Sequence, residues 1–246
     1  MSATASEIER FNRLSVSWWD SLGPMRPLHV VNALRLHYVV DQIASHRKSD
    51  RGDGLRGLRI LDVGCGGGLM SEALARLGAQ VVGVDASEGN INAARRHASS
   101  QGVAVDYRLG ESTSALSPDE QFDVILALEV VEHVTDVRTF LASTVDHLAS
   151  GGLLLVSTIN RTLKSFFFAI IGAEYVFRVL PQGTHRWSLF VRPQELDSAL
   201  AAVGLQRRDL RGMQYLPVLH RAAWCRSTQV NYISTYATIR TAACKV

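Results

Sequence analysis

Short apolar runs alternate with segments of helical periodicity along most of the chain. The apolar runs are Leu58–Val63, Gln80–Val84, Val103–Leu109, Phe122–Leu128 and Gly152–Thr158. Segments whose apolar residues are spaced as in a helix lie between them, for example Leu69–Leu77, Ile91–Ser99 and Val137–Leu148. This alternation predicts an α/β fold with a doubly wound, mostly parallel sheet covered by helices on both faces.

The N-terminal part of the chain has a different pattern. Helical stretches are predicted at Ala5–Trp19 and Val30–His46, and a turn-rich stretch joins them. A linker dense in charge and glycine follows at Ser49–Gly57. We therefore expect a helical cap over residues 1–50 and one α/β domain over residues 51–246.

The composition indicates a globular protein with one large core and argues against nucleic acid as a partner. A chain of 246 residues with 47% hydrophobic residues can bury one large core, and a net charge of +3 is too small to indicate a nucleic-acid-binding surface. We expect no nucleic-acid partner. The three cysteines show no C-x-x-C spacing, which argues against a disulfide framework.

A glycine-rich turn follows the first predicted strand. Asp62 lies near the end of that strand and is an expected cofactor-binding residue, and four glycines fall within residues 64–68 before the next helix begins. Because ligands of such folds bind beyond the carboxyl ends of the strands, bare main chain at Gly64 and Gly66 predicts a cofactor lying against it. The dinucleotide pattern G-x-G-x-x-G is not met, since Leu69 occupies its last position. Taken alone, such a turn could equally be structural.

Two further positions fall at the same edge of the predicted sheet. Asp85 ends the second strand, where a carboxylate can accept both hydroxyls of a ribose, or can simply cap a helix. Leu128 ends the fourth strand and either contacts the adenosine or belongs to the core. The glycine turn and Asp85 on consecutive β-α units together favour a cofactor site.

An acidic cluster follows the fourth strand. If the chain turns helically there, Glu129, Glu132 and His133 fall at i, i+3 and i+4 and share one face. Two carboxylates and an imidazole could bind a divalent cation such as Mg²⁺ or Mn²⁺, which would activate a phenol oxygen. Without a metal, His133 or a neighbouring glutamate would act as general base. In both cases these three are the expected catalytic residues.

Several strings resemble the family of ubiquinone biosynthesis O-methyltransferases, which are class I, Rossmann-like methyltransferases. They are F-N-R-L-S-V-S-W-W-D from Phe11, L-H and N-A-L-R from Leu28, L-D-V-G-C-G-G-G, E-V-V-E-H, S-T-I-N-R-T, G-A-E-Y, G-T-H-x-W and V-N-Y. The resemblance covers nearly the whole chain. It implies S-adenosylmethionine as the methyl donor, and 3-demethylubiquinol and an earlier polyprenylated dihydroxybenzene as acceptors.

The resemblance also implies roles for individual residues. It places cofactor contacts at Arg35, Gly64, Asp85 and Leu128, and a divalent cation at Glu129, Glu132 and His133. Periodicity alone would have left Arg35 on a solvated helix face. Two alternatives stay open: a methyltransferase for another small phenol or lipid, and a non-catalytic member of a membrane-attached biosynthetic assembly.

An apolar insertion follows the fifth strand, at about residues 161–192. Its segment Arg161–Leu180 contains three consecutive phenylalanines flanked by Lys164 and Arg178, and it is too interrupted to span a bilayer. Such a segment could pack against the sheet as a cap helix or lie on an anionic membrane surface. With a polyprenylated substrate, we expect a peripheral membrane protein, cytoplasmic if bacterial and on the matrix side if mitochondrial. A ubiquinone biosynthesis complex is a further candidate partner.

Overall fold

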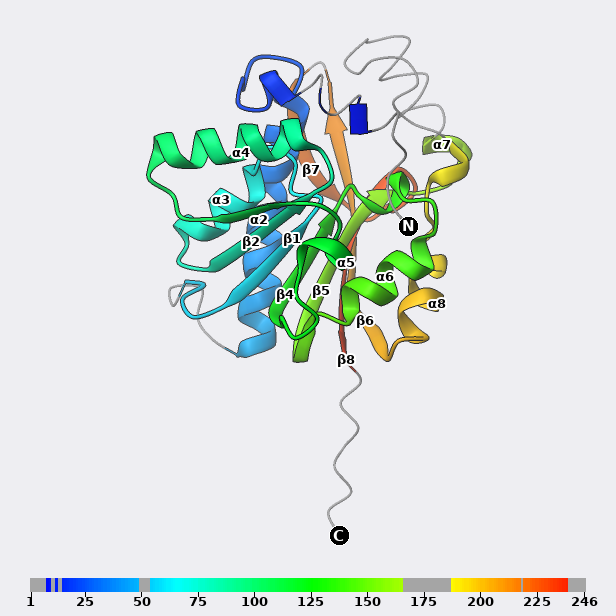
Figure 1. Ribbon diagram of the computed structural model, residues 1–246. Coiled ribbons are helices and arrows are strands. Elements are labelled where there is room, and N and C mark those ends of the chain that lie inside the picture. Colours follow the sequence, from blue (N-terminus) through cyan, green and yellow to red (C-terminus); the bar gives the residue numbers. More distant parts are fainter. Residues whose placement is uncertain are drawn as a thin grey trace.

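The computed structural model describes residues 8, 9, 12, 15–48, 54–165, 187–217 and 219–238. The sheet has eight strands in the order β3-β2-β1-β4-β5-β8-β6-β7 (Figure 1). Their bounds are β1 Arg59–Val63, β2 Gln80–Asp85, β3 Asp106–Leu109, β4 Phe122–Leu128, β5 Leu148–Ile159, β6 Leu205–Leu216, β7 Arg221–Cys225 and β8 Asn231–Thr238.

The first five strands confirm the predicted parallel sheet. β1 pairs in parallel with β2 and β4, β3 joins the outer side of β2, and β5 joins β4. β8 then pairs antiparallel with β5, and β6 pairs antiparallel with β8 and with β7. The apolar runs predicted none of β6, β7 and β8. β6 and β7 are largely half-buried or exposed, and polar residues interrupt the apolar positions of β8.

The helices observed after residue 25 are α2 Arg26–Arg47, α3 Leu69–Arg76, α4 Glu88–Gln101, α5 Ser112–Ala115, α6 Val137–Val145, α7 Leu163–Ser165 and α8 Pro193–Ala201. α6 is shorter than expected, because the chain turns at Asp146 and β5 already begins at Leu148. α2 begins before the predicted Val30, since Pro27 fits the first turn of a helix.

Helices cover both faces of the sheet (Figure 1), and an apolar core lies on each face. On one face, Tyr38, Val39 and Ile43 of α2 pack with strand residues such as Ile60 and Leu155. On the other face, residues of α6 and α8, including Leu141 and Leu196, pack with β4, β5 and β8. α2 is thus built into the core that covers the sheet and does not stand apart from it.

The expected N-terminal helix Ala5–Trp19 is described only in part. A 3-10 helix, η1, spans Ser15–Ser17, and the chain turns at Trp18 and Trp19. The three phenylalanines of the apolar insertion lie outside the described residues. In the part of the chain that the structure covers, no helix is long and apolar enough to cross a membrane.

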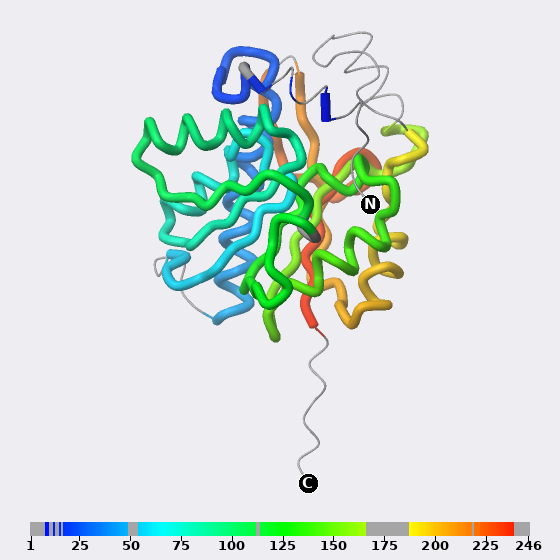
Figure 2. The backbone as a smooth tube through the Cα atoms, in the orientation of Figure 1, coloured from blue at the N-terminus to red at the C-terminus, as the bar shows by residue number. Residues whose placement is uncertain are grey.

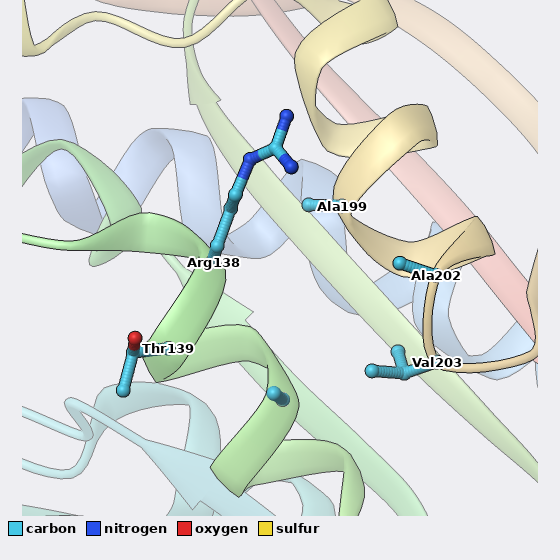
Figure 3. A pocket seen from close by; sticks show the side chains of 6 residues that line it. Arg138, Thr139, Ala199, Ala202 and Val203 are labelled. Carbon is cyan, nitrogen blue, oxygen red and sulfur yellow. The ribbon is translucent and has the colours of Figure 1, made fainter.

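One surface groove, of about 260 Å³, lies between α6 and α8 (Figure 3). Its lining residues are Arg138, Thr139, Ala142, Ala199, Ala202 and Val203. None of them belongs to the predicted site, which lies at the carboxyl ends of β1, β2 and β4.

Candidate active site

The glycine turn connects β1 to α3 and has a backbone that favours glycine. Gly64, Gly66 and Gly68 have φ values of +69°, +55° and +87°, where side chains with a Cβ are strained. A Cβ at Gly64 would lie 2.4 Å from Val130 Cγ2, and one at Gly66 would lie 2.5 Å from the Trp18 ring. Val130 and the Trp18 ring thus lie where Cβ atoms at Gly64 and Gly66 would project. The missing Cβ atoms serve close packing here.

Asp85 lies directly beside this turn, as predicted. Its Oδ2 accepts a hydrogen bond from the Gly66 backbone N–H at 2.9 Å, and its Oδ1 accepts one from the Ser87 N–H at 2.8 Å. Burial raises the pKa of the Asp85 carboxyl, and these backbone donors oppose that rise. The carboxylate is thus held at the end of β2, next to the bare main chain.

Asp62 is buried below the turn. Its Oδ2 accepts a hydrogen bond from the Ser71 hydroxyl at 2.6 Å, which ties β1 to α3. Burial raises the pKa of Asp62 to about 7, the Ser71 hydrogen bond opposes the rise, and the charge of Asp85 adds to it. In this arrangement Asp62 supports the turn from the side of the core.

Arg35 and Glu129, which are 94 residues apart in the sequence, form an ion pair. Arg35 is 1% exposed, although periodicity predicted a solvated position. Glu129 also accepts a hydrogen bond from the Ser157 hydroxyl at 3.0 Å and lies 3.5 Å from Asn231 Nδ2. The Nε of Arg35 and the Oδ1 of Asn231 are buried and have no hydrogen-bond partner among the described residues. This end of β4 therefore has polar groups available to a ligand.

The predicted helical face of Glu129, Glu132 and His133 is wrong. Glu129 has φ +57° and precedes the short 3-10 helix η3, which spans Val131–His133. A left-handed residue followed by a 3-10 turn does not give the i, i+3, i+4 alignment of an α-helix. Glu129 turns to Arg35, whereas Glu132 is buried and accepts a hydrogen bond from the Thr158 hydroxyl at 2.7 Å.

These side chains do not fit the expected divalent cation in this arrangement. Among the described residues, no group of three or more His, Cys, Asp or Glu side chains is arranged to hold a metal ion. The donor types suit Mg²⁺, but the Glu129 carboxylate is already paired with Arg35. The metal prediction thus lacks support from the geometry.

Glu132 and His133 interact electrostatically. Burial raises the pKa of Glu132 to about 7, the charge of Glu129 raises it further, and His133 acts in the opposite direction. A carboxyl group with a pKa near neutrality, next to an imidazole, suits proton transfer.

Relatives with established names match almost the full length of the chain. Residues 61–156 match a methyltransferase domain family. The ubiquinone biosynthesis O-methyltransferase of Azorhizobium caulinodans is 50% identical over 231 residues, covering 92% of this chain and 90% of its own. The protein of the same name from a Chelativorans species is 49% identical over 231 residues, covering 93% and 91%. This chain belongs to the ubiquinone biosynthesis O-methyltransferase family.

The fold agrees with this family. Magnesium protoporphyrin IX methyltransferase from Synechocystis PCC 6803, solved with bound S-adenosylhomocysteine, superposes with a TM-score of 0.63 at 19% identity, covering 86% of each chain. This chain thus has the class I methyltransferase fold, and it is an enzyme that uses S-adenosylmethionine.

Several polar contacts in this family member were not among the predicted site residues. The hydroxyls of Ser157 and Thr158 of β5 donate to Glu129 and Glu132. Asn90 donates to Asp85 and accepts a hydrogen bond from Trp18. Three of these four residues lie in the strings S-T-I-N-R-T and W-W-D. The family strings could therefore have pointed to them as site residues. Leu128 ends β4 as predicted and packs, partly buried, against the core on the α2 face.

Proposed function

We propose that this enzyme transfers the methyl group of S-adenosylmethionine to a phenolic hydroxyl of polyprenylated catechol-type intermediates in ubiquinone biosynthesis. The acceptors would be 3-demethylubiquinol and the earlier polyprenylated dihydroxybenzene. Support comes from relatives named ubiquinone biosynthesis O-methyltransferase at 50% and 49% identity over most of the chain.

The packing of Val130 against Gly64 is the structural observation that supports this proposal. Val130 lies between Glu129 and Glu132 in the sequence and fills the space beside Gly64. The glycine turn, which would hold the methyl donor, therefore adjoins the loop that would hold the acceptor. Methyl transfer is an in-line displacement, so donor and acceptor must be held side by side in a fixed orientation.

The cofactor contacts follow from the same arrangement. Asp85 would accept the ribose hydroxyls, and Arg35 would bind the carboxylate of the methionine part. Gly64, Gly66 and Leu128 would line the crevice, and Asp62 would keep the turn in place. Arg35 would then contact both the cofactor and Glu129.

His133 would act as general base, supported by the buried carboxylate of Glu132. The phenol oxygen attacks the methyl carbon, the carbon–sulfur bond breaks, and S-adenosylhomocysteine leaves as a neutral thioether. The phenol proton passes to the His133 imidazole, and the negative charge of Glu132 stabilises the imidazolium that forms.

A substrate comparison tests this function. With S-adenosylmethionine present, we expect the enzyme to methylate a short-tailed 3-demethylubiquinol far faster than a simple catechol, which has neither the methoxy substitution nor the tail. The products are measured by chromatography with mass detection. Equal turnover of both acceptors, or turnover of the simple catechol alone, would support a methyltransferase for another small phenol.

We also propose that the enzyme contacts an anionic membrane surface through its apolar insertion. Leu163 is 73% exposed and Trp187 is 36% exposed, and they lie on either side of residues 166–186. Exposed apolar side chains of this kind insert at the boundary between headgroups and acyl chains.

Vesicle sedimentation tests the membrane contact. We expect the protein to sediment with vesicles that contain phosphatidylglycerol, and Leu163→Ser to reduce the bound fraction because an exposed apolar side chain is lost. Leu22→Ser is the matched control, since Leu22 is also exposed but lies in the N-terminal part of the chain. Identical sedimentation of all three proteins, or none at all, would contradict the proposal.

A further inference from the structure

The N-terminal segment lies near α4 (Figure 2) and is bonded to the start of that helix, next to Asp85. The side-chain oxygen of Asn12 accepts hydrogen bonds from the Ser87 hydroxyl at 2.7 Å and from the Gly89 backbone N–H at 2.9 Å. Trp18, only 7% exposed, packs over Gly66 and Gly67. This segment therefore covers the two elements that hold Asp85, namely the glycine turn and the first turn of α4.

A chain of hydrogen bonds connects Trp18 to Asp85. The indole N–H of Trp18 donates to Asn90 Oδ1 at 2.7 Å, and Asn90 Nδ2 donates to Asp85 Oδ1 at 3.2 Å. An indole N–H can only donate, so it fixes the amide oxygen of Asn90 toward Trp18 and the amide NH₂ toward Asp85. Asn90 is 2% exposed, which leaves water little access to replace either bond.

The orientation of the Asp85 carboxylate depends in part on this chain. Its protein donors among the described residues are the backbone N–H groups of Gly66 and Ser87 and the side chain of Asn90. A carboxylate offers about four acceptor positions, and these donors occupy most of them. The position that remains for a ligand donor therefore points in a fixed direction. Asn90 is the only side-chain donor of the three and is itself held by Trp18.

We propose that Asn90 is a positioning residue that aims the Asp85 carboxylate at the ribose of S-adenosylmethionine, and that Trp18 sets the orientation of Asn90. The N-terminal segment is thereby part of the cofactor site. This inference rests on the proposed role of Asp85 in binding the ribose hydroxyls. It assigns no chemical step to either residue, so their loss affects cofactor affinity and leaves the chemistry intact.

Binding of S-adenosylhomocysteine, measured by calorimetry, tests the proposal. Because a hydrogen bond to a charged group is lost, we expect Asn90→Ala to weaken binding about tenfold or more, and Trp18→Phe to weaken it about fivefold. The double variant should bind no more weakly than Asn90→Ala, since Trp18 acts through Asn90. The matched control is Trp224→Phe, a tryptophan of β7 that packs on Tyr38, and it should bind like the parent.

Two further readouts separate positioning from a general loss of structure. Asn90→Asp keeps an acceptor for Trp18 but removes the donor to Asp85, so it should weaken binding even when its melting temperature equals that of the parent. With saturating S-adenosylmethionine, kcat of the Asn90 and Trp18 variants should stay within about twofold of the parent while KM for the cofactor rises. Loss of the 2′-hydroxyl from S-adenosylhomocysteine should reduce the binding affinity of Asn90→Ala by a smaller factor than that of the parent.

The outcomes distinguish this inference from the proposed function. If Asp85→Asn binds S-adenosylhomocysteine as tightly as the parent, the proposed cofactor site is wrong. If Asp85→Asn loses affinity while Asn90→Ala, Asn90→Asp and Trp18→Phe bind normally, the site stands and the positioning role is overturned. A double variant whose loss equals the product of the two single losses would show that Trp18 does not act through Asn90.

Discussion

Replacing His133 with alanine is expected to lower kcat for methyl transfer by about 100- to 10,000-fold, the usual contribution of a general base. The phenol then has no imidazole to receive its proton. The affinity for S-adenosylhomocysteine should change little, because His133 has no proposed cofactor contact. Steady-state rates at saturating acceptor and cofactor, together with calorimetry, measure the two effects separately.

The matched control is His46→Ala. His46 lies in the last turn of α2 and bonds to the carbonyl of Gly151, at the opposite end of β5 from Ser157 and Thr158. Its loss should leave kcat within about twofold of the parent, since a surface substitution of this kind changes little. A His133→Ala variant that keeps a third or more of the parental kcat would rule out its role as base.

The pH dependence of kcat should reflect the ionisation of Glu132. Burial raises the pKa of this carboxyl to about 7, so its charged form, which stabilises the imidazolium, increases as pH rises through about 7. kcat should therefore rise across this range in the parent, and Glu132→Gln should lower kcat and flatten that rise.

Replacing Arg35 with alanine is the second change with a large expected effect, here on both stability and cofactor binding. Arg35 is 1% exposed and pairs with Glu129, whose side chain is 24% exposed. Breaking a fully buried pair costs about 3–5 kcal/mol, and partial exposure of Glu129 reduces this to about 2–3 kcal/mol. KM for S-adenosylmethionine should rise as well, because the proposed partner of its carboxylate is gone.

A second substitution separates these two effects. Arg35→Ala/Glu129→Gln removes the uncompensated charge, so it should regain part of the lost free energy of unfolding, measured by denaturant titration. Its KM for the cofactor should stay high. Recovery of cofactor affinity together with stability would mean that Arg35 is structural and does not contact the cofactor.

The pattern of apolar residues predicted the parallel half of the fold well, for a physical reason. Strands buried on both faces, such as β4, are continuous apolar runs whose bounds can be read directly. β6 pairs antiparallel and has alternating and exposed positions, so only tertiary pairing with β8 defines it. The premature end of α6 depends on the turn at Asp146 and on β5 pairing, which helical periodicity does not contain.

The position of Asp85 was predictable, because it ends β2 and therefore lies at the edge of the sheet where the glycine turn begins. The site was not predictable where the outcome depended on backbone conformation. The left-handed φ of Glu129 breaks the helical spacing assumed for the acidic cluster and directs its carboxylate to Arg35. The hydrogen bond from Trp18 to Asn90 joins positions 72 apart in sequence, and neither residue has a periodicity that reveals it.

A structure of the enzyme with bound S-adenosylhomocysteine tests the central claim most directly, namely that the methyl donor lies at the glycine turn and beside the loop that begins at Glu129. We expect the ribose hydroxyls on Asp85, the homocysteine part along Gly64 and Gly66, and the sulfur facing the loop that contains Glu129 and His133. Ligand bound elsewhere, or a sulfur atom directed away from that loop, would contradict the account.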